Sequence, residues 1–142
     1  MPIRKADAQW DGSLQKGTGT MRLGGGAYEG PYSFSSRFEE GTGTNPEELI
    51  AAAHSGCYSM ALAGALGRAG HEPTRVSTTA SVHLERQEAG FRIVRIDLDT
   101  EAEVPGIDEA SFAEIAEATK SACPVSVALS AVEITLDARL KN

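Results

Sequence analysis

The sequence has few cysteines, few aromatic residues and a shortage of positive charge. Its 142 residues include two cysteines, and 13 Lys and Arg stand against 20 Asp and Glu, for a net charge of −7. Nucleic acids and anionic membranes select clustered Lys and Arg, so we expect neither as a partner. Two cysteines 66 residues apart, with no CxxC pair, are unlike a secreted disulfide framework.

The N-terminal segment also lacks an apolar run long enough for a signal peptide, so we expect a cytoplasmic protein. Hydrophobic residues make up 41% of the chain and charged residues 23%, which is ordinary for a globular protein. This length and composition favour a single domain over residues 1–142.

Formal charge is absent from residues 49–67, a run of nineteen residues. Three residues predict that a helix begins just before this run: Asn45 as the N-cap, Pro46 at the first helical position, and Glu48 completing a capping box. The glycines and the proline of residues 67–73 predict that the helix ends near residue 69.

The composition of this helix argues against a membrane span, although its length would allow one. Ala, Gly and Ser dominate it, and His54 interrupts it. A helix made of small uncharged residues is typical of burial on all sides. One sheet from a chain of this size covers one face of such a helix, so we expect a second copy of the chain to cover the rest. The alternative is a monomer in which a second helix and loops complete the cover.

Alternating patterns and turn residues predict further elements in an α+β order. Strands are predicted at residues 17–23, 31–38, 76–85, 91–104 and 132–140, the third and fourth as an antiparallel hairpin. Glycine-rich turns are predicted at 24–26 and 29–31. Asp108 is expected to cap a second helix, and Pro124 to begin a short third one with Cys123 at its N-cap. The inward stripe of the second helix is predicted to be Phe112, Ile115, Ala116 and Thr119.

The surroundings of the two cysteines leave several interpretations open. A free cysteine is often an inert buried hydrophobe. Cys57, however, has only Gly56 and Tyr58 beside it and His54 one turn earlier, while Cys123 lies at a helix N-terminus that favours a thiolate. The two thiols could meet in space. A zinc site made of Cys57, Cys123, His54 and a carboxylate is a further alternative, although its spacing is unlike that of structural zinc sites.

Two motifs are similar to a known family. "SRFEEGTGTNPEELIAAAHSGCYSM" and "SACPVS" resemble the OsmC/Ohr family of thiol-dependent peroxidases, and its OsmC branch in particular. The similarity extends to "AQWDGSLQKGTGT", "VPGID" and "EITLDARL", and so covers essentially the whole chain. It implies an OsmC/Ohr-like fold, with antiparallel β-sheets and a long buried central helix, in an intertwined homodimer.

The resemblance also implies a function. It implies reduction of organic hydroperoxides, and of hydrogen peroxide less well, in oxidative or osmotic stress defence. An external dithiol would recycle the enzyme, and no metal, flavin or haem would be needed. By the same resemblance Cys57 is the peroxidatic cysteine, Cys123 the resolving one, Arg37 stabilises the thiolate and Glu47 holds Arg37. Without the resemblance, Arg37 and Glu47 would be interpreted as a surface ion pair.

Two other classes of function remain as alternatives. One is a thiol-based redox sensor or binding module, in which oxidation of Cys57 changes a partner contact. The other is a structural dimer with inert cysteines.

The helix itself predicts how a site could be shared. Ten helical residues separate Glu47 from Cys57, a rise of about 15 Å and a rotation of roughly 80°. The resemblance nevertheless implies that Arg37, Glu47 and the thiols share one site. Both statements hold if the helices of two subunits pack antiparallel, so we expect two sites per dimer, each with Cys57 and Cys123 from one chain and Glu47 from the other.

Overall fold

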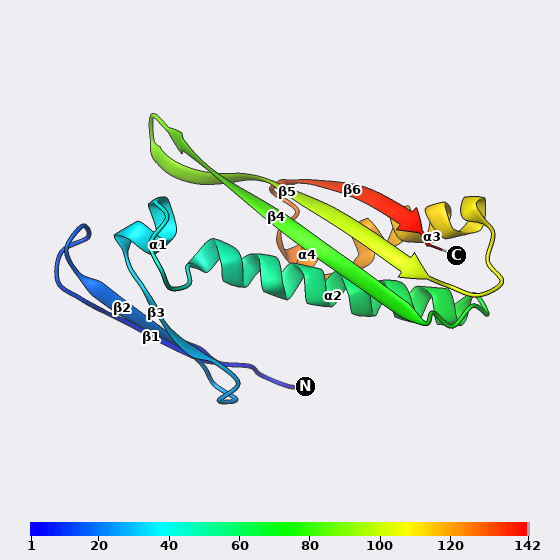
Figure 1. Ribbon diagram of the computed structural model, residues 1–142, viewed down its shortest axis with the longest axis horizontal. Coiled ribbons are helices and arrows are strands. Elements are labelled where there is room, and N and C mark those ends of the chain that lie inside the picture. The colour runs from blue at the N-terminus through cyan, green and yellow to red at the C-terminus, as the bar shows by residue number, and fades with distance from the viewer. Residues whose placement is uncertain (142) are drawn as a thin grey trace. The chain divides into compact units, whose positions relative to one another are not determined.

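The computed structural model describes residues 1–141 and divides the chain into two compact units (Figure 1). Unit 1 comprises residues 1–49, and unit 2 begins at residue 50. Each unit contains one three-stranded sheet. The arrangement confirms the predicted α+β class.

Unit 1 is an antiparallel sheet followed by a short helix. Its strands β1 (Ala6–Asp11), β2 (Thr18–Leu23) and β3 (Glu29–Tyr32) pair in the order β1-β2-β3. The predicted strand at 17–23 is confirmed, as is the turn at 24–26, where Gly26 has φ of +81°. The predicted turn at 29–31 is wrong, because these residues belong to β3.

The predicted strand at 31–38 is also wrong over most of its length. The chain leaves β3 after Tyr32 and forms helix α1 (Phe34–Phe38). The cause is a capping box made of two serines: the Ser36 N–H donates to Ser33 Oγ at 3.1 Å, and the Ser33 N–H donates to Ser36 Oγ at 2.8 Å. This local bonding offers the backbone an alternative to the sheet ladder.

Helix α2 (Pro46–Arg68) confirms the long predicted helix. Asn45 Oδ1 accepts the Glu48 N–H at 2.7 Å, as expected of the N-cap. The Glu48 carboxylate accepts a hydrogen bond from the Thr44 hydroxyl at 2.9 Å. At the other end, Gly70 adopts φ of +90° and the His71 N–H donates to the Leu66 carbonyl at 2.9 Å, which closes the helix.

Unit 2 holds a mixed sheet. Strands β4 (Arg75–Gln87) and β5 (Gly90–Glu103) form the predicted antiparallel hairpin, whereas β6 (Glu133–Leu140) pairs with β5 in parallel. The prediction of antiparallel sheets therefore fails at this one pair. The chain crosses from β5 to β6 through α3 (Glu109–Ala122) and α4 (Pro124–Ala128), and such a crossover returns the chain in the same direction.

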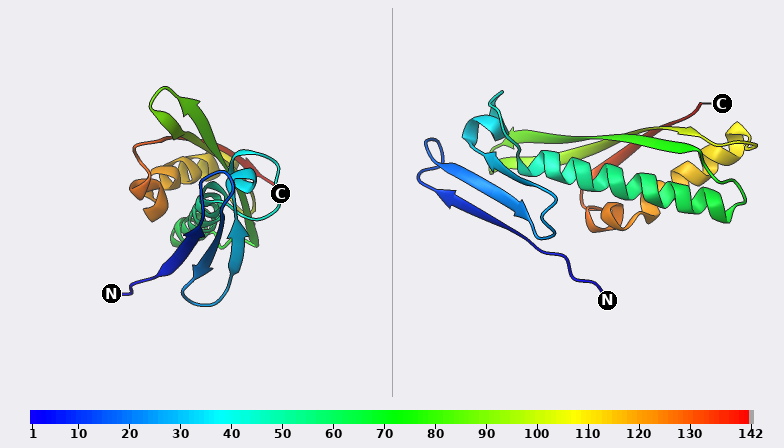
Figure 2. Two further views of the ribbon diagram at one scale, coloured as in Figure 1. Left: turned by 90° about the vertical axis from the view of Figure 1, so that its left-hand side faces the viewer. Right: turned by 60° about the horizontal axis from the view of Figure 1, so that its bottom comes forward.

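The core of unit 2 lies between this sheet and its helices, which cover one face of the sheet (Figures 1 and 2). Tyr58 is fully buried, and its hydroxyl donates to the Ala116 carbonyl of α3 at 3.0 Å. The other buried apolar residues of this core are Leu62, Leu66, Ile96, Leu98, Ala102, Val104, Ile107, Phe112, Ala116 and Cys123. Three of the four residues predicted for the inward stripe of α3 (Phe112, Ala116 and Thr119) are buried, and Ile115 is half-buried.

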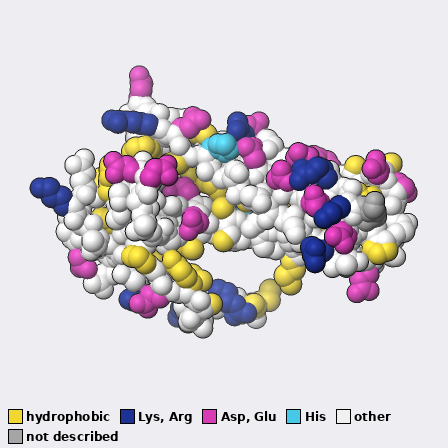
Figure 3. Space-filling model, in the orientation of Figure 1, with side chains coloured by type: hydrophobic (Ala, Val, Ile, Leu, Met, Phe, Trp, Pro, Cys, Tyr) yellow, Lys and Arg dark blue, Asp and Glu magenta, His cyan; other side chains and the backbone are white. Residues whose placement is uncertain are grey.

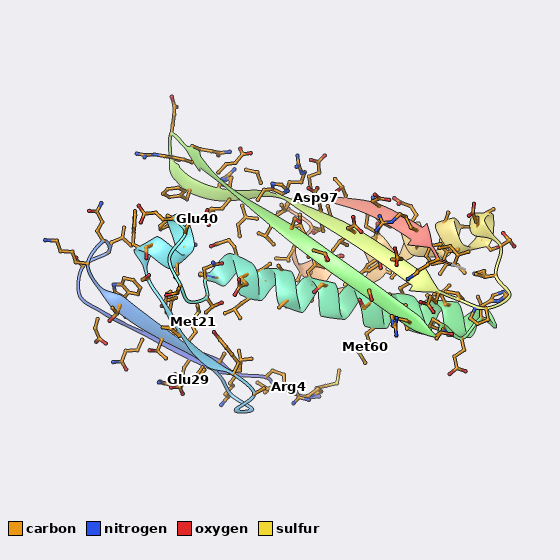
Figure 4. All side chains as sticks on the ribbon, viewed as in Figure 1. Arg4, Met21, Glu29, Glu40, Met60 and Asp97 are labelled. Atoms are coloured by element: carbon orange, nitrogen blue, oxygen red, sulfur yellow. The ribbon has the colours of Figure 1, made fainter. Side chains whose placement is uncertain are left out.

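The opposite face of this sheet is polar. Asp97 projects from β5 away from α2 (Figure 4). Acidic and basic side chains are intermingled over the strand ends of unit 2, and no large surface of one sign is visible on the face that Figure 3 shows. These side chains form ion pairs across the strands, such as Arg139 with Asp99 at 2.6 Å.

Burial of α2 is one-sided in the single chain. Its buried positions from residue 50 onward recur every fourth residue, at His54, Tyr58, Leu62 and Leu66. Met60 is 79% exposed and points away from the sheet (Figure 4). By length and composition alone α2 could cross a membrane, and 22% of its most apolar window is buried. The predicted burial on all sides is thus not achieved by one chain.

Candidate active site

The structure brings the two cysteines together within unit 2. Cys57 lies in the middle of α2, and Cys123 lies where α3 ends and α4 begins. Their Sγ atoms are 2.9 Å apart, at hydrogen-bonding distance, and both thiols are free. Cys123 is fully buried and Cys57 is half-buried, so an oxidant from solvent has better access to Cys57.

The start of α4 supplies backbone donors to both sulfur atoms. Pro124 occupies the first helical position, and Cys123 is the N-cap without a side-chain capping bond. The Val125 and Ser126 amides act to lower the pKa of Cys123, and the Val125 amide acts to lower that of Cys57. Backbone amides at a helix start stabilise a thiolate.

The two thiols nevertheless differ in acidity. Burial raises the pKa of Cys57, and its contact with Cys123 raises it further. Burial also acts to raise the pKa of Cys123, but hydrogen bonds from Cys57, from the Ser126 amide and from the Ser126 side chain outweigh it, and the net pKa is lowered. The direction of this shift is the one expected of a thiol at a helix N-terminus. Among the groups of unit 2, over residues 50–141, that act on the pKa of Cys57 there is no cation.

Unit 1 contains the second predicted pair. Arg37 Nε donates to Glu47 Oε1 at 3.0 Å, and Nη2 donates to Oε2 at 2.9 Å, a bidentate arrangement. Glu47 is 8% exposed, whereas about a third of the Arg37 side chain remains exposed. The guanidinium also lies over the Phe38 ring, 5.2 Å from its centroid. Arg37 is thus a cation held by a buried carboxylate, with part of its side chain still exposed.

A partly apolar hollow adjoins Arg37 in unit 1. Its volume is about 410 Å³. Its lining residues are Trp10, Gly12, Leu14, Tyr32, Ser33, Phe34, Arg37 and Phe38. Such a hollow, with one cation among aromatic side chains, suits a small apolar molecule with a polar end.

A buried histidine–serine pair lies beside Cys123 and was not predicted. His54 is fully buried, and its Nε2 is 2.8 Å from the Ser126 Oγ. Burial lowers the pKa of His54, so the ring stays neutral. The two residues are 72 positions apart, and no local pattern connects them, so only the fold reveals the pair.

The zinc alternative finds no support in the described part of the chain. Over residues 1–141 no group of three His, Cys, Asp or Glu side chains could hold a metal ion. His54 directs its Nε2 to a hydroxyl. His83 pairs instead with Asp97 on β5, with its Nε2 2.7 Å from the Asp97 Oδ2.

Comparison with known proteins places this geometry in a family. The OsmC-like protein family pattern matches residues 39–137. The chain is 49% identical over 140 residues to a protein of Escherichia coli K12 named Peroxiredoxin OsmC, covering 98% of this chain and 97% of that one. It is 32% identical over 98 residues to the organic hydroperoxide resistance protein of Xanthomonas axonopodis pv. citri, covering 68% and 67%.

Solved structures share the fold. An organic hydroperoxide resistance protein OsmC from Legionella pneumophila superposes with a TM-score of 0.70 over 100% of both chains at 20% identity. An OsmC-like protein of unknown function from Vibrio cholerae gives 0.76 over 97% of this chain and 99% of that one, at 14% identity. The predicted resemblance is confirmed: this chain belongs to the OsmC family.

Proposed function

We propose that this protein is a thiol-dependent peroxidase that reduces organic hydroperoxides to alcohols. The observation that carries the proposal is the Cys57–Cys123 sulfur pair, 2.9 Å apart at the start of α4. It occurs in a chain whose relatives are named for a peroxiredoxin and for organic hydroperoxide resistance. Sulfur supplies the redox equivalents, so the chemistry requires no metal, flavin or haem.

The first step takes place at Cys57, the more accessible thiol. Its thiolate attacks the outer oxygen of the hydroperoxide, the O–O bond breaks, and an S–O bond forms. Cys57 becomes a sulfenic acid, and the departing alkoxide takes up a proton to give the alcohol. Arg37, held by Glu47, stabilises both the thiolate and the developing negative charge on oxygen.

The second step closes a disulfide. The Cys123 sulfur attacks the Cys57 sulfur, the S–O bond breaks, and hydroxide leaves with a proton as water. An external dithiol then reduces the disulfide by exchange and is itself oxidised to a disulfide. Because the pKa of Cys123 is lowered, Cys123 more readily forms the thiolate that attacks in this step.

The cation that Cys57 needs comes, in this proposal, from a second copy of the chain. Within α2 Glu47 precedes Cys57 by ten residues, about 15 Å of rise, and Glu47 holds Arg37. A homodimer would cover the exposed side of α2 and place the Arg37–Glu47 pair of one chain against the cysteine pair of the other. Units 1 and 2 would then be parts of a single domain over residues 1–142.

The hollow beside Arg37 supports a preference among oxidants. Aromatic side chains form much of its lining, so the alkyl or aryl group of an organic hydroperoxide that binds there is removed from water, which favours binding. Hydrogen peroxide has no such group, so it gains nothing from that burial. We therefore expect organic hydroperoxides to react faster than hydrogen peroxide. We place this activity in the cytoplasm, as part of oxidative or osmotic stress defence.

Stopped-flow mixing with cumene hydroperoxide tests the proposal. Fast oxidation of Cys57, followed by many turnovers when a dithiol is present, is the expected result. Slow oxidation that consumes one equivalent of hydroperoxide per chain and then stops would support a redox sensor instead. No oxidation at all would leave a structural dimer with inert cysteines.

A further inference from the structure

The His54–Ser126 pair has no part in the two-cysteine chemistry as described above, yet it touches one of the reacting atoms. Ser126 is 3% exposed and lies in the first turn of α4, three residues after the N-cap Cys123, where its hydroxyl acts as a hydrogen-bond donor that lowers the pKa of Cys123. The Ser126 Oγ lies 2.8 Å from His54 Nε2. His54 is fully buried. Three side chains from two distant parts of the sequence therefore form a continuous buried chain: His54, Ser126, Cys123.

Which atom donates in each hydrogen bond of this series follows from one buried nitrogen that has no partner. His54 Nδ1 is buried and has no hydrogen-bond partner in the described structure. A neutral imidazole carries its proton on one nitrogen, and a buried N–H without an acceptor is rarer than a buried acceptor without a donor. The proton therefore belongs on Nε2, which donates to the Ser126 Oγ. The Ser126 hydroxyl proton is then free to point at the Cys123 sulfur.

We propose that Ser126 is a catalytic residue for closure of the Cys57–Cys123 disulfide, and that His54 is the positioning residue that fixes its hydroxyl as a donor to Cys123. The inference rests on the proposed peroxidase function. Cys123 loses its proton to become a thiolate that accepts the Ser126 hydrogen bond. Its electron pair forms the S–S bond, the S–O bond of the Cys57 sulfenic acid breaks, and hydroxide leaves with the released proton as water.

This assignment separates the two chemical steps. Ser126 acts on the pKa of Cys123, whereas Cys123 and the Val125 amide are the groups that act on the pKa of Cys57 besides burial. Removing the Ser126 hydroxyl should therefore leave attack on the hydroperoxide nearly unchanged and slow the disulfide step. A purely structural role would instead lower stability and affect both steps alike.

The first test needs no turnover. In a Cys57→Ser background Cys123 is the sole thiol, and its thiolate absorbance can be titrated with pH. Adding Ser126→Ala should raise the pKa of Cys123 by about one pH unit or more, because a hydrogen bond to a charged group is lost. Ser126→Thr should keep the original pKa, and His54→Gln should raise it by less than Ser126→Ala. The pKa of Tyr58 is raised by burial, and by the charges of Glu117 and Cys123, so Tyr58 stays neutral throughout this titration.

The second test follows single turnovers. After one equivalent of cumene hydroperoxide, Ser126→Ala should form the Cys57 sulfenic acid at the normal rate and close the disulfide about tenfold more slowly or worse. Trapping with a sulfenic-acid reagent and non-reducing peptide mass spectrometry resolve the two steps. Ser130→Ala, at an exposed serine just beyond α4, is the matched control and should behave as wild type.

The two tests distinguish failure of the inference from failure of the proposed function. If Ser126→Ala and His54→Gln both fold, as judged by thermal melting, and leave the Cys123 titration and the disulfide rate unchanged, the inference is wrong. If the wild-type thiols do not react with hydroperoxide, the proposed function fails, while the titration still supports or overturns the hydrogen-bond chain. Should Ser126→Ala not fold, His54→Gln carries the comparison, with Ser126→Thr as the control that keeps the hydroxyl.

Discussion

At the scale of single residues, the two thiols have different surroundings and therefore different tasks. Cys123 is buried, and Cys57, two backbone amides and the Ser126 side chain together lower its pKa. Cys57 is more accessible, but its pKa is raised by burial and by the neighbouring thiol. The accessible sulfur therefore needs a cation to become a thiolate, and Arg37 is our candidate for it.

Single cysteine substitutions should give two different failures. Cys57→Ser should abolish reduction of hydroperoxide, because the attacking atom is gone. Cys123→Ser should allow one oxidation of Cys57 and then stop, because no sulfur closes the disulfide. Mass spectrometry after one equivalent of peroxide should show a trapped or over-oxidised Cys57 in the second variant. Full multiple turnover by Cys123→Ser with a dithiol would contradict the two-cysteine cycle.

Removing the arginine should raise the pKa of Cys57 above its value in the wild-type dimer. We expect Arg37→Ala to slow attack on the hydroperoxide by about a hundredfold, a loss typical of one electrostatic group in an active site. Arg37→Lys should rescue only part of this, because an ammonium cannot form the bidentate contact with Glu47 and face sulfur together. Thiolate absorbance in a Cys123→Ser background reports the pKa of Cys57. A titration that does not move would exclude Arg37 from the site.

At the scale of elements, local sequence signals predicted the structure well where they act within one segment. Asn45, Pro46 and the glycines after residue 66 determined both ends of α2, and Asp108 caps α3 as predicted. The β4–β5 hairpin follows from alternation and a short turn. Helix α1 was missed because the aromatic residues of 32–38 favour a strand, whereas the serine capping box overrides that propensity.

What the sequence could not predict depends on long-range packing. The parallel register of β6 requires knowledge of the path taken by α3 and α4. Family resemblance pointed to Cys57, Cys123, Arg37 and Glu47, and the structure places the first two in contact and the last two in contact. Ser126 was missed, because nothing in "PVSVALS" distinguishes a serine that faces a thiol from one that faces water.

The outer face of the unit 2 sheet should contribute stability that depends on pH. Hydrogen bonds from Thr135, Arg95 and His83 lower the pKa of Asp97 from 3.8 to about 2. A lowered carboxyl pKa stabilises the fold above pH 3.8, and this contribution is lost as pH falls towards 2. We expect Asp97→Asn to reduce the free energy of unfolding at neutral pH by about 1 kcal/mol, a value discounted because a third of the side chain is exposed.

Urea unfolding at a series of pH values measures this effect. The difference in the free energy of unfolding between wild type and Asp97→Asn should become smaller as pH is lowered from 3.8 towards 2. Asp137→Asn, at a β6 side chain that is 70% exposed, is the control and should change stability by less than about 0.5 kcal/mol. An Asp97→Asn difference of equal size at neutral and acid pH would contradict the assigned cause.

At the scale of the whole molecule, the main feature is that a single chain buries only one side of α2. Its buried residues lie on a single stripe, while Met60 and much of the uncharged surface remain exposed. Exposed apolar surface of this kind marks an interaction site in a protein. A second copy of the chain, packed along α2, would bury it and would bring the Arg37–Glu47 pair to the partner's cysteines.

Subunit mixing tests this shared site. Cys57→Ser and Glu47→Ala should each be inactive or severely impaired alone. After unfolding and refolding together, half of the dimers contain one chain of each kind and one complete site, so activity should return to about a quarter of wild type. Mixing Cys57→Ser with Cys123→Ser is the control, because neither chain then provides a complete cysteine pair. A mixture that reassembles but stays inactive would contradict the shared site, as would a fully active monomer.

The central claim is that a hydroperoxide is reduced by electrons from Cys57 and Cys123 together. Non-reducing mass spectrometry of the wild-type protein, after one equivalent of an organic hydroperoxide, tests it most directly. The account predicts that the chain loses two hydrogens, gains no oxygen, and yields a peptide in which Cys57 is joined to Cys123, with one equivalent of alcohol formed. A chain that gains oxygen without that linkage, or that keeps both thiols while the peroxide remains, would contradict it.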